Sequence, residues 1–253
     1  MTLYELLRAI AFRIADARQG AAGGGSTTTL LAANLNEPSG YWNDGSLFID
    51  LVPPVIVSIA GWNGATKTFT FEAQSGAITA GTTFTVISQK YPPDILRRAV
   101  WQAFHDIGYR MALDETLTTQ SGSLSYDIPG GREDIRRVEI LRPNGTGEIV
   151  YNWRVLENKL VFDKQPAADR TIRLHYVRAP QVPSGLSDAL DPLVNPELLT
   201  VVACMHALMW RNYKVGRDEP NTSELLNYYV QTAMAMNYLR PQLLPRDPIL
   251  ARY

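Results

Sequence analysis

Histidine and cysteine are the residues of this chain that first suggest chemistry, because they bind metals and serve as acids, bases and nucleophiles. The 253-residue chain has His105, His175, His206 and a single cysteine, Cys204. No two histidines show the His-x2-His or His-x3-His spacing of a metal site. Cys204 and His206 fall on one predicted helix, about 200° apart, and so point to different sides. We expect a core cysteine, an interfacial or partly buried histidine, and no metal.

A glycine-rich stretch and a pair of aspartates are the other candidates for chemistry. Residues 23–27, Gly-Gly-Gly-Ser-Thr, lack the lysine of a phosphate-binding loop and do not join a strand to a helix, which favours a flexible turn. Asp188 and Asp191 flank a helix start, which favours capping over acid/base catalysis. No nucleophile-elbow or dinucleotide-binding motif occurs. The sequence therefore predicts a non-enzymatic protein with no catalytic residue and no cofactor.

The charges of the chain nearly cancel, with 24 Lys and Arg against 25 Asp and Glu. Long-range attraction to nucleic acid therefore has no obvious source, which argues against a general DNA-binding protein. One arginine cluster is neutralised by its own neighbours, which indicates a salt-bridged surface or a subunit contact. This possible interface has Arg132, Arg136 and Arg137 alternating with Glu133, Asp134 and Glu139.

Five tryptophans could form an aromatic sugar-binding face or could anchor an interface, although most are expected in the core. Trp62 falls at the tip of a predicted hairpin, where an aromatic ring is exposed unless something covers it. It is therefore the best single interface candidate. The other four are Trp42, Trp101, Trp153 and Trp210.

Four helices are predicted to position these residues. Apolar residues repeat at steps of three and four from Leu3 to Ala17, and again after Pro92-Pro93 as far as about Leu113. Asn195-Pro196-Glu197 supplies a capping side chain, a first-turn proline and an acid for the third helix. Asn221 with Glu224 starts the fourth, which Pro241 stops. Since each stripe needs cover from water, we expect the four helices to pack together.

Two segments have the alternating pattern of β-strands. In the first, strands at 55–60 and 66–71 flank Trp62-Asn63-Gly64, a strong hairpin signal, and a third strand covers 82–87. The second segment, 116–177, contains strands at 136–141, 153–156, 159–162 and 171–177, with Glu157-Asn158 as a tight turn.

Together these elements predict an α+β fold with three parts. Residues 1–18 and 91–240 form a four-helix bundle with the inserted β segment 116–177. Residues 19–90 form a β-rich insertion domain after the first helix. Residues 241–253 form an extended C-terminal docking arm, because their prolines prevent a helix.

No apolar run reaches the ~20 residues that span a bilayer, so no membrane span is predicted. One cysteine and no apolar signal core indicate synthesis in a reducing cytoplasm. The portal- or partner-binding residues of the arm are predicted to be Leu243, Leu244, Arg246, Ile249, Leu250, Arg252 and Tyr253. The alternative is an arm folded back along its own helical bundle.

Three stretches resemble the head-to-tail adaptor, or connector, proteins of tailed bacteriophages. They are GGGSTTTLLAANLNEPSGYWNDGSLFI, YPPDILRRAVWQAFHDIGYRM and KLVFDKQPAADRTIRLHYVRAP. The resemblance implies a virion protein at the head–tail junction, made in the host cytoplasm. It also implies a dodecameric homo-oligomeric ring that contacts the portal protein and a tail or nozzle protein, with DNA passing through the lumen without sequence-specific binding.

Other functions fit the same pattern. Another phage neck or tail-completion protein belongs to the same structural class. A carbohydrate-binding β module would need an exposed coplanar aromatic face, and an enzyme would need polar side chains converging in a pocket.

Overall fold

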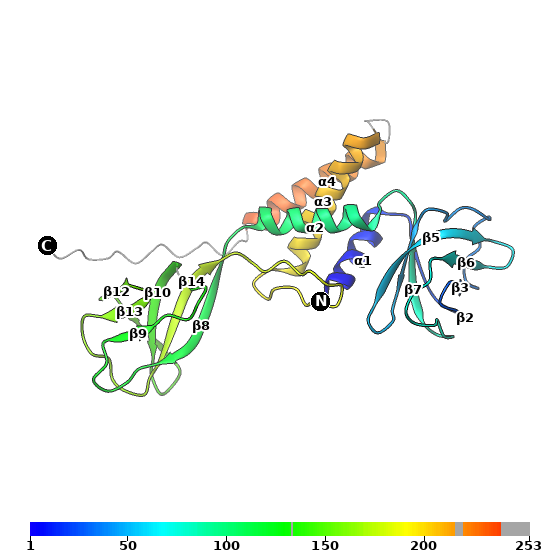
Figure 1. Cartoon of the computed structure of the whole chain (residues 1–253). Helices are drawn as coiled ribbons and strands as arrows, with labels where there is room; N and C mark the ends of the chain where they lie inside the picture. Colours follow the sequence, from blue (N-terminus) through cyan, green and yellow to red (C-terminus); the bar gives the residue numbers. More distant parts are fainter. Residues whose placement is uncertain (133, 216–219, 239–253) are drawn as a thin grey trace. The chain divides into compact units, whose positions relative to one another are not determined.

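The computed structural model describes residues 1–132, 134–215 and 220–238, and these divide into two compact units (Figure 1). Unit 1 comprises Met1–Ile107 and the described residues from Gln181 onwards; unit 2 comprises Gly108–Pro180. The described residues form fourteen strands in three antiparallel sheets, together with four helices. The predicted fold class, a four-helix bundle carrying a β insertion, is therefore wrong, because the chain is mostly β-sheet.

The helices of unit 1 begin where the sequence provides capping groups. In α1 (Leu3–Ile14) the Thr2 hydroxyl accepts from the Glu5 N–H while the Glu5 carboxylate accepts from the Thr2 N–H. The side-chain oxygen of Asn195 accepts from the Glu197 N–H at 2.8 Å, as predicted for the start of α3. The helix bounds are α1 Leu3–Ile14, α2 Pro93–Ile107, α3 Pro196–Val215 and α4 Pro220–Tyr238.

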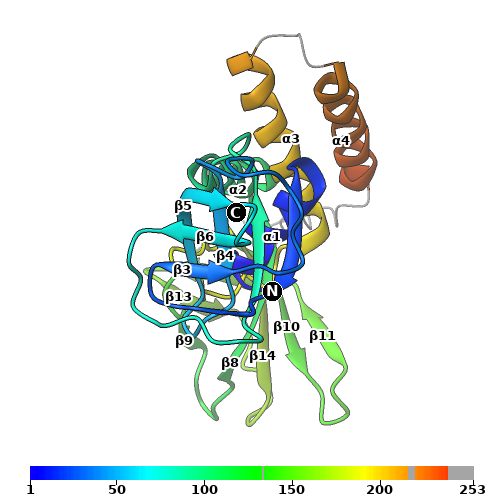
Figure 2. The same cartoon turned by 90° about the vertical axis from the view of Figure 1, so that its right-hand side faces the viewer.

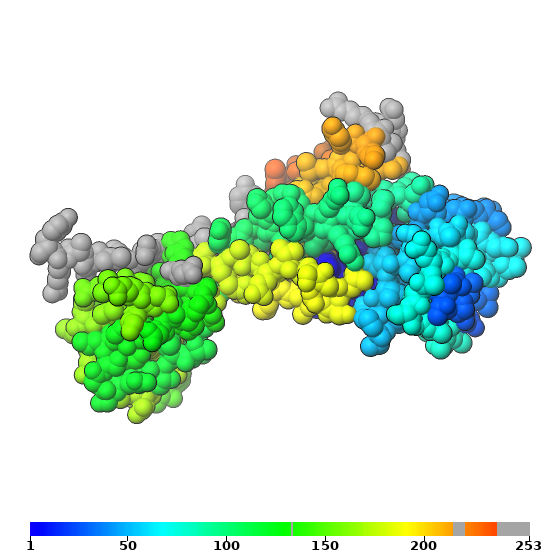
Figure 3. Space-filling model, viewed as in Figure 1, coloured from blue at the N-terminus to red at the C-terminus, as the bar shows by residue number. Residues whose placement is uncertain are grey.

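All four helices contribute to one apolar core (Figure 2). The segment before α3, yellow in Figure 3, lies against this helical part: the Leu3 N–H donates to the Asp188 carbonyl at 3.0 Å. The Arg13 guanidinium binds both carboxylate oxygens of Glu197, at 2.9 and 2.8 Å, and so links α1 to α3. The buried side chains of this core include Leu6, Leu7, Ile10, Val100, Phe104, Leu199, Leu208 and Tyr229.

A seven-stranded antiparallel sheet completes unit 1. Asn63 ends the long strand of the predicted hairpin, and the next strand begins at Thr68, so the hairpin is confirmed. The sheet order is β1-β7-β4-β5-β6-β3-β2. The strands are β1 Ala17–Ala21, β2 Gly24–Gly25, β3 Thr29–Leu31, β4 Ser46–Ile49, β5 Val55–Asn63, β6 Thr68–Phe71 and β7 Thr83–Ile87.

Strand β4 is buried on both faces, because it lies between two cores. Leu47 and Ile49 face a second apolar cluster inside the sheet, whereas Phe48 joins the helical core and meets the Tyr4 ring at 5.8 Å. Strand β1, which follows α1 almost directly, pairs with β7 from Ala17 to Ala21. The predicted insertion domain at 19–90 is thus built into the same unit as the helices, and the division of the chain differs from the predicted one.

The Asp50 carboxylate joins α1 to this sheet. It accepts from the Tyr4 hydroxyl at 2.6 Å, the Thr83 hydroxyl at 2.6 Å and the Arg8 guanidinium at 3.0 Å. Burial alone would raise the pKa of Asp50, but the hydrogen bonds from Thr83 and Tyr4 and the charge of Arg8 more than offset it. The pKa of this carboxyl therefore lies below its usual range.

We expect Asp50→Asn to lower the free energy of unfolding by about 2 kcal/mol at pH 7, because three donors lose a charged acceptor. The native carboxyl binds protons more weakly than the unfolded one. Its stabilisation is therefore complete above the unfolded pKa of about 4 and is lost as the pH falls through the lower native pKa. Urea unfolding from pH 7 downwards should show the difference between wild type and variant shrinking below about pH 4. Glu72→Gln, at an exposed acid of the same unit, is the control; a gap that does not change with pH would contradict the assignment.

Unit 2 consists of two antiparallel sheets, ordered β11-β10-β14-β8 and β12-β13-β9. The tight turn between β12 and β13 is confirmed: Glu157 and Asn158 both adopt positive φ, 48° and 60°. Side chains such as Val138 and Leu174 are buried on the larger sheet, and Leu160 and Phe162 on the smaller. The strands are β8 Arg110–Thr118, β9 Ser125–Asp127, β10 Asp134–Leu141, β11 Gly147–Val150, β12 Trp153–Leu156, β13 Lys159–Phe162 and β14 Thr171–Arg178.

The second helix is shorter than predicted, because Gly108 ends it. Gly108 adopts φ 66°, the left-handed conformation that commonly terminates a helix. Met111, placed on the helix by its spacing, instead lies in β8 opposite Val177. The β segment therefore begins at Arg110 and forms a unit of its own.

The predicted C-terminal arm, residues 241–253, lies outside the described residues. In the part of the chain that the structure does describe, no helix combines the length and the apolar character needed to cross a membrane.

Candidate binding groove

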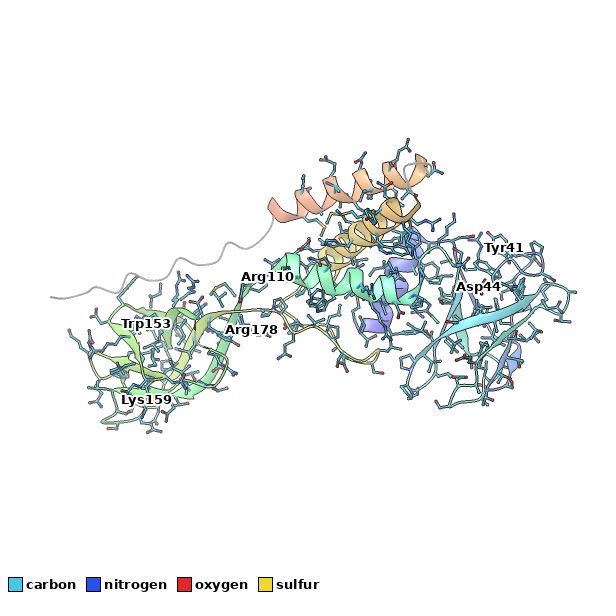
Figure 4. All side chains as sticks on the ribbon, turned by 45° about the horizontal axis from the view of Figure 1, so that its top comes forward. Tyr41, Asp44, Arg110, Trp153, Lys159 and Arg178 are labelled. Carbon is cyan, nitrogen blue, oxygen red and sulfur yellow. The ribbon has the colours of Figure 1, made fainter. Side chains whose placement is uncertain are left out.

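A groove of about 720 Å³ opens on unit 1 where three segments meet near the end of α1. The segments are the loop before β4 (40–44), the connection from β7 to α2 (88–92) and the last turns of α3 (210–214). Asp16, just after α1, closes one side. Figure 4 labels Tyr41 and Asp44 on the first of these segments.

Buried tryptophans fix the loop that bears Tyr41 and Asp44. Trp42 is fully buried in the sheet core, and its ring meets the Tyr41 ring edge-on at 4.8 Å. The Trp62 ring is also buried, and its indole N–H donates to the Glu37 carbonyl at 3.0 Å. The Asn43 side chain accepts from the Trp62 N–H at 2.8 Å. These contacts hold the loop while leaving the Tyr41 and Asp44 side chains exposed.

One wall of the groove is acidic. The Tyr41 hydroxyl donates to the Asp16 carboxylate at 2.5 Å, and this hydrogen bond raises the pKa of Tyr41 above its usual range. Arg18 also pairs with Asp16, at 3.3 Å. Asp44 adopts φ 60°, which Asp tolerates better than most residues. Among the described residues the Asp44 carboxylate has no hydrogen-bond or ion-pair partner.

The opposite wall is basic and aromatic. Lys90 and Lys214 are exposed, and the Lys214 ammonium lies 5.7 Å from the centre of the Trp210 ring. Arg211 lines the same wall. Within the described part of the chain Lys90 has no ion-pair partner. Fixed charges of both signs beside two aromatic rings suit the binding of a polar, extended ligand.

Trp62, the best interface candidate from the sequence, does not lie at an exposed hairpin tip. It is 4% exposed because β5 continues through it and the loop before β4 covers it. The predicted interface role assumed an exposed ring, and Trp62 is buried. Its contacts instead hold the loop that forms one side of the groove.

The predicted arginine cluster belongs to unit 2 and is paired. Arg136 binds Asp134 at 2.7 Å and Arg137 approaches Glu139 at 3.8 Å, as the alternation of charges predicts. Arg132 instead binds Asp114 of β8 at 2.9 Å, a partner that the sequence did not indicate. The cluster is therefore paired within unit 2, and a contact role for it stays a prediction.

The histidines pair with carboxylates on neighbouring elements. The His206 imidazole on α3 lies 2.7 Å from the Asp106 carboxylate on α2, which His105 also approaches at 3.8 Å. His175 lies 3.2 Å from Glu139 on the adjacent strand. In the described residues no group of three or more His, Cys, Asp and Glu side chains could hold a metal ion. The His206–Asp106 pair links the two helices.

Cys204 is buried in the helical core, on the side facing Arg13 and Tyr229, and burial raises the pKa of its thiol to about 12. We expect the native protein to react with a disulfide reagent at pH 8 more than about a hundredfold more slowly than the unfolded chain, because the thiolate is the reactive form. Absorbance of the released thiol, with and without guanidinium, measures this. Rapid reaction of the folded protein would show that the thiol is accessible.

A second cavity, of about 360 Å³, lies on unit 2 beside the ends of β10 and β11. It is lined by Arg142 and Glu148, whose side chains pair at 3.1 Å, and by Arg170. Arg142 and Glu148 are thus already paired with each other, whereas Asp44 and Lys90 of the groove have no ion-pair partner among the described residues.

No protein-family model matches this chain, and a comparison with curated protein sequences also finds no match.

Proposed function

We propose that this chain is a non-enzymatic structural subunit at the head–tail junction of a tailed phage. In this role it forms a ring that joins the portal to the tail and encloses a DNA channel. The sequence resemblance supplies the class of protein. The observation that carries the proposal further is a set of large apolar side chains exposed on the helices of unit 1.

Three of these side chains lie on α2 and α3. Tyr213 is 92% exposed, Trp101 59% and Met209 49%. Met209 and Tyr213 are four residues apart and so share one face of α3. Tyr, Trp and Met are enriched in protein interfaces, and large apolar side chains grouped on a surface mark contact sites. These exposed side chains support a subunit that covers part of its helical surface by contact with other proteins in an assembly.

A carbohydrate-binding module is less well supported. Three of the five tryptophans, Trp42, Trp62 and Trp153, are buried and therefore cannot stack on a sugar. No described feature favours that function over a structural role.

Electron microscopy of the purified protein, with and without the portal protein encoded in the same genome, tests the proposal. We expect a ring of this chain on the portal, and Tyr213→Glu should reduce its occupancy whereas Glu72→Lys should not. Absence of any complex at saturating protein would refute the adaptor role. Binding to a tail protein alone would identify a different neck protein.

A further inference from the structure

The groove on unit 1 displays charges of both signs, and its ligand should therefore carry both. Asp44 on one wall and Lys90 on the other have no ion-pair partner among the described residues. We propose that this groove binds the C-terminal segment, residues 241–253, of a second copy of this chain. The inference deepens the proposed function, on whose homo-oligomer it rests, by naming a contact between copies.

Charge complementarity is the first argument. The segment PQLLPRDPILARY has adjacent charges of opposite sign, Arg246 and Asp247, at its centre. An extended chain projects neighbouring side chains in different directions, so Arg246 can face the acidic wall while Asp247 faces Lys90. A ligand with one sign of charge would meet repulsion from one of the two walls.

The prolines are the second argument. Pro245 and Pro248 flank the charged pair and favour the extended polyproline conformation, which docks in aromatic-lined grooves at little entropic cost. The groove has an aromatic ring on each wall, Tyr41 and Trp210. Docking in the groove would also remove apolar side chains of the segment from water.

The reach of the segment favours a second copy over the same chain. Lys214 lies at the end of α3 where α4 begins, whereas the segment leaves from the other end of α4, 19 residues away. That helix is about 28 Å long, and the eight residues from 239 to 246 span about 25 Å as polyproline. To reach the groove of its own chain, the segment would have to run back in a nearly fully extended form along the whole of α4, a constraint that does not apply to the segment of a second copy.

A charge exchange tests the proposal with full-length receptors and labelled peptides of residues 240–253. One receptor carries Arg246→Asp, which leaves the groove intact and disables its own segment. The other carries Asp44→Lys and keeps the natural segment. Fluorescence anisotropy at low salt is measured with the natural peptide and with the Arg246→Asp peptide.

We expect the natural peptide to prefer the intact groove by about fivefold and the exchanged peptide to prefer the Asp44→Lys groove by a similar factor. Asp44→Asn, which suits the positive φ, should weaken the natural peptide without attracting the exchanged one. Glu72→Lys, added to the intact-groove receptor, is the matched control and should change neither affinity. Sedimentation of the wild-type chain should show self-association that Asp44→Lys reduces.

Three results would overturn the inference. The first is a natural peptide that does not bind, and the second is one that binds both grooves equally. The third is a wild-type chain that stays monomeric at a concentration that saturates peptide binding, which would mean that each chain holds its own segment. A segment that binds the portal but not the groove would also overturn it, yet would leave the adaptor role intact.

Discussion

Phe104→Ala should lower the free energy of unfolding by about 3–5 kcal/mol, the largest stability change expected from a single substitution discussed for this chain. Phe104 is 3% exposed and lies in the core to which all four helices contribute. Removing the ring loses its transfer free energy and leaves a cavity in a core packed from four helices, which can relax only partly.

Trp101→Ala on the same helix is the control, because that ring is 59% exposed and its loss should cost less than about 1 kcal/mol. Chemical denaturation monitored by circular dichroism measures both variants. If the two substitutions cost the same, the buried face of α2 would be assigned wrongly.

Structure set by a few adjacent residues was predictable from the sequence. Asn195 caps α3 as expected, since its side chain reaches the Glu197 N–H two residues on. The Glu157-Asn158 turn was also found at its predicted place, with both residues at positive φ, and the hairpin predicted at Asn63-Gly64 turns through residues 64–67.

Structure set by distant pairing was not predictable in the same way. Met111 continues the apolar spacing of α2, but Gly108 ends the helix and β8 pairs with β14, more than sixty residues away. The residue types at 17–21 do not indicate that this segment pairs with β7. Apolar stripes of period 3.6 dominate the sequence pattern, whereas the many short strands that make up most of the fold have a weaker local signal.

The groove could not be foreseen for the same reason. Tyr41 and Asp44 stand in a polar turn, Lys90 in a connection and Trp210 on a helix, and only the folded chain brings them together. A partial signal was present: Asn43-Asp44-Gly45 suggests a tight turn, which would have placed Asp44 on the surface. The exposure predicted for Trp62 was wrong, because the hairpin signal locates the turn but does not show that the loop before β4 covers the Trp62 ring.

Truncation after Arg240 should abolish assembly while leaving the fold intact. Among the residues that the structure describes, the two apolar cores of unit 1 are built from residues before Asn237, so thermal unfolding should stay within about 2 °C of wild type. The thirteen residues removed include four large aliphatic side chains, Leu243, Leu244, Ile249 and Leu250, and two arginines. Apolar anchors with a few charges are what a docking segment needs, and prolines lower the entropy lost on binding.

Two measurements on the truncated chain separate the possible partners of this segment. Co-sedimentation with the portal reports portal docking, and sedimentation of the protein alone reports contact between copies. A chain ending in thirteen Gly and Ser residues is the control, because it keeps the length without the anchors. Loss of self-association together with loss of portal binding is expected if the segment seats in a neighbour's groove and the ring is needed to hold the portal. Loss of portal binding alone would assign the segment to the portal. Retention of both by the truncated chain would show that residues 241–253 dock on neither, since no other change has been made to the protein.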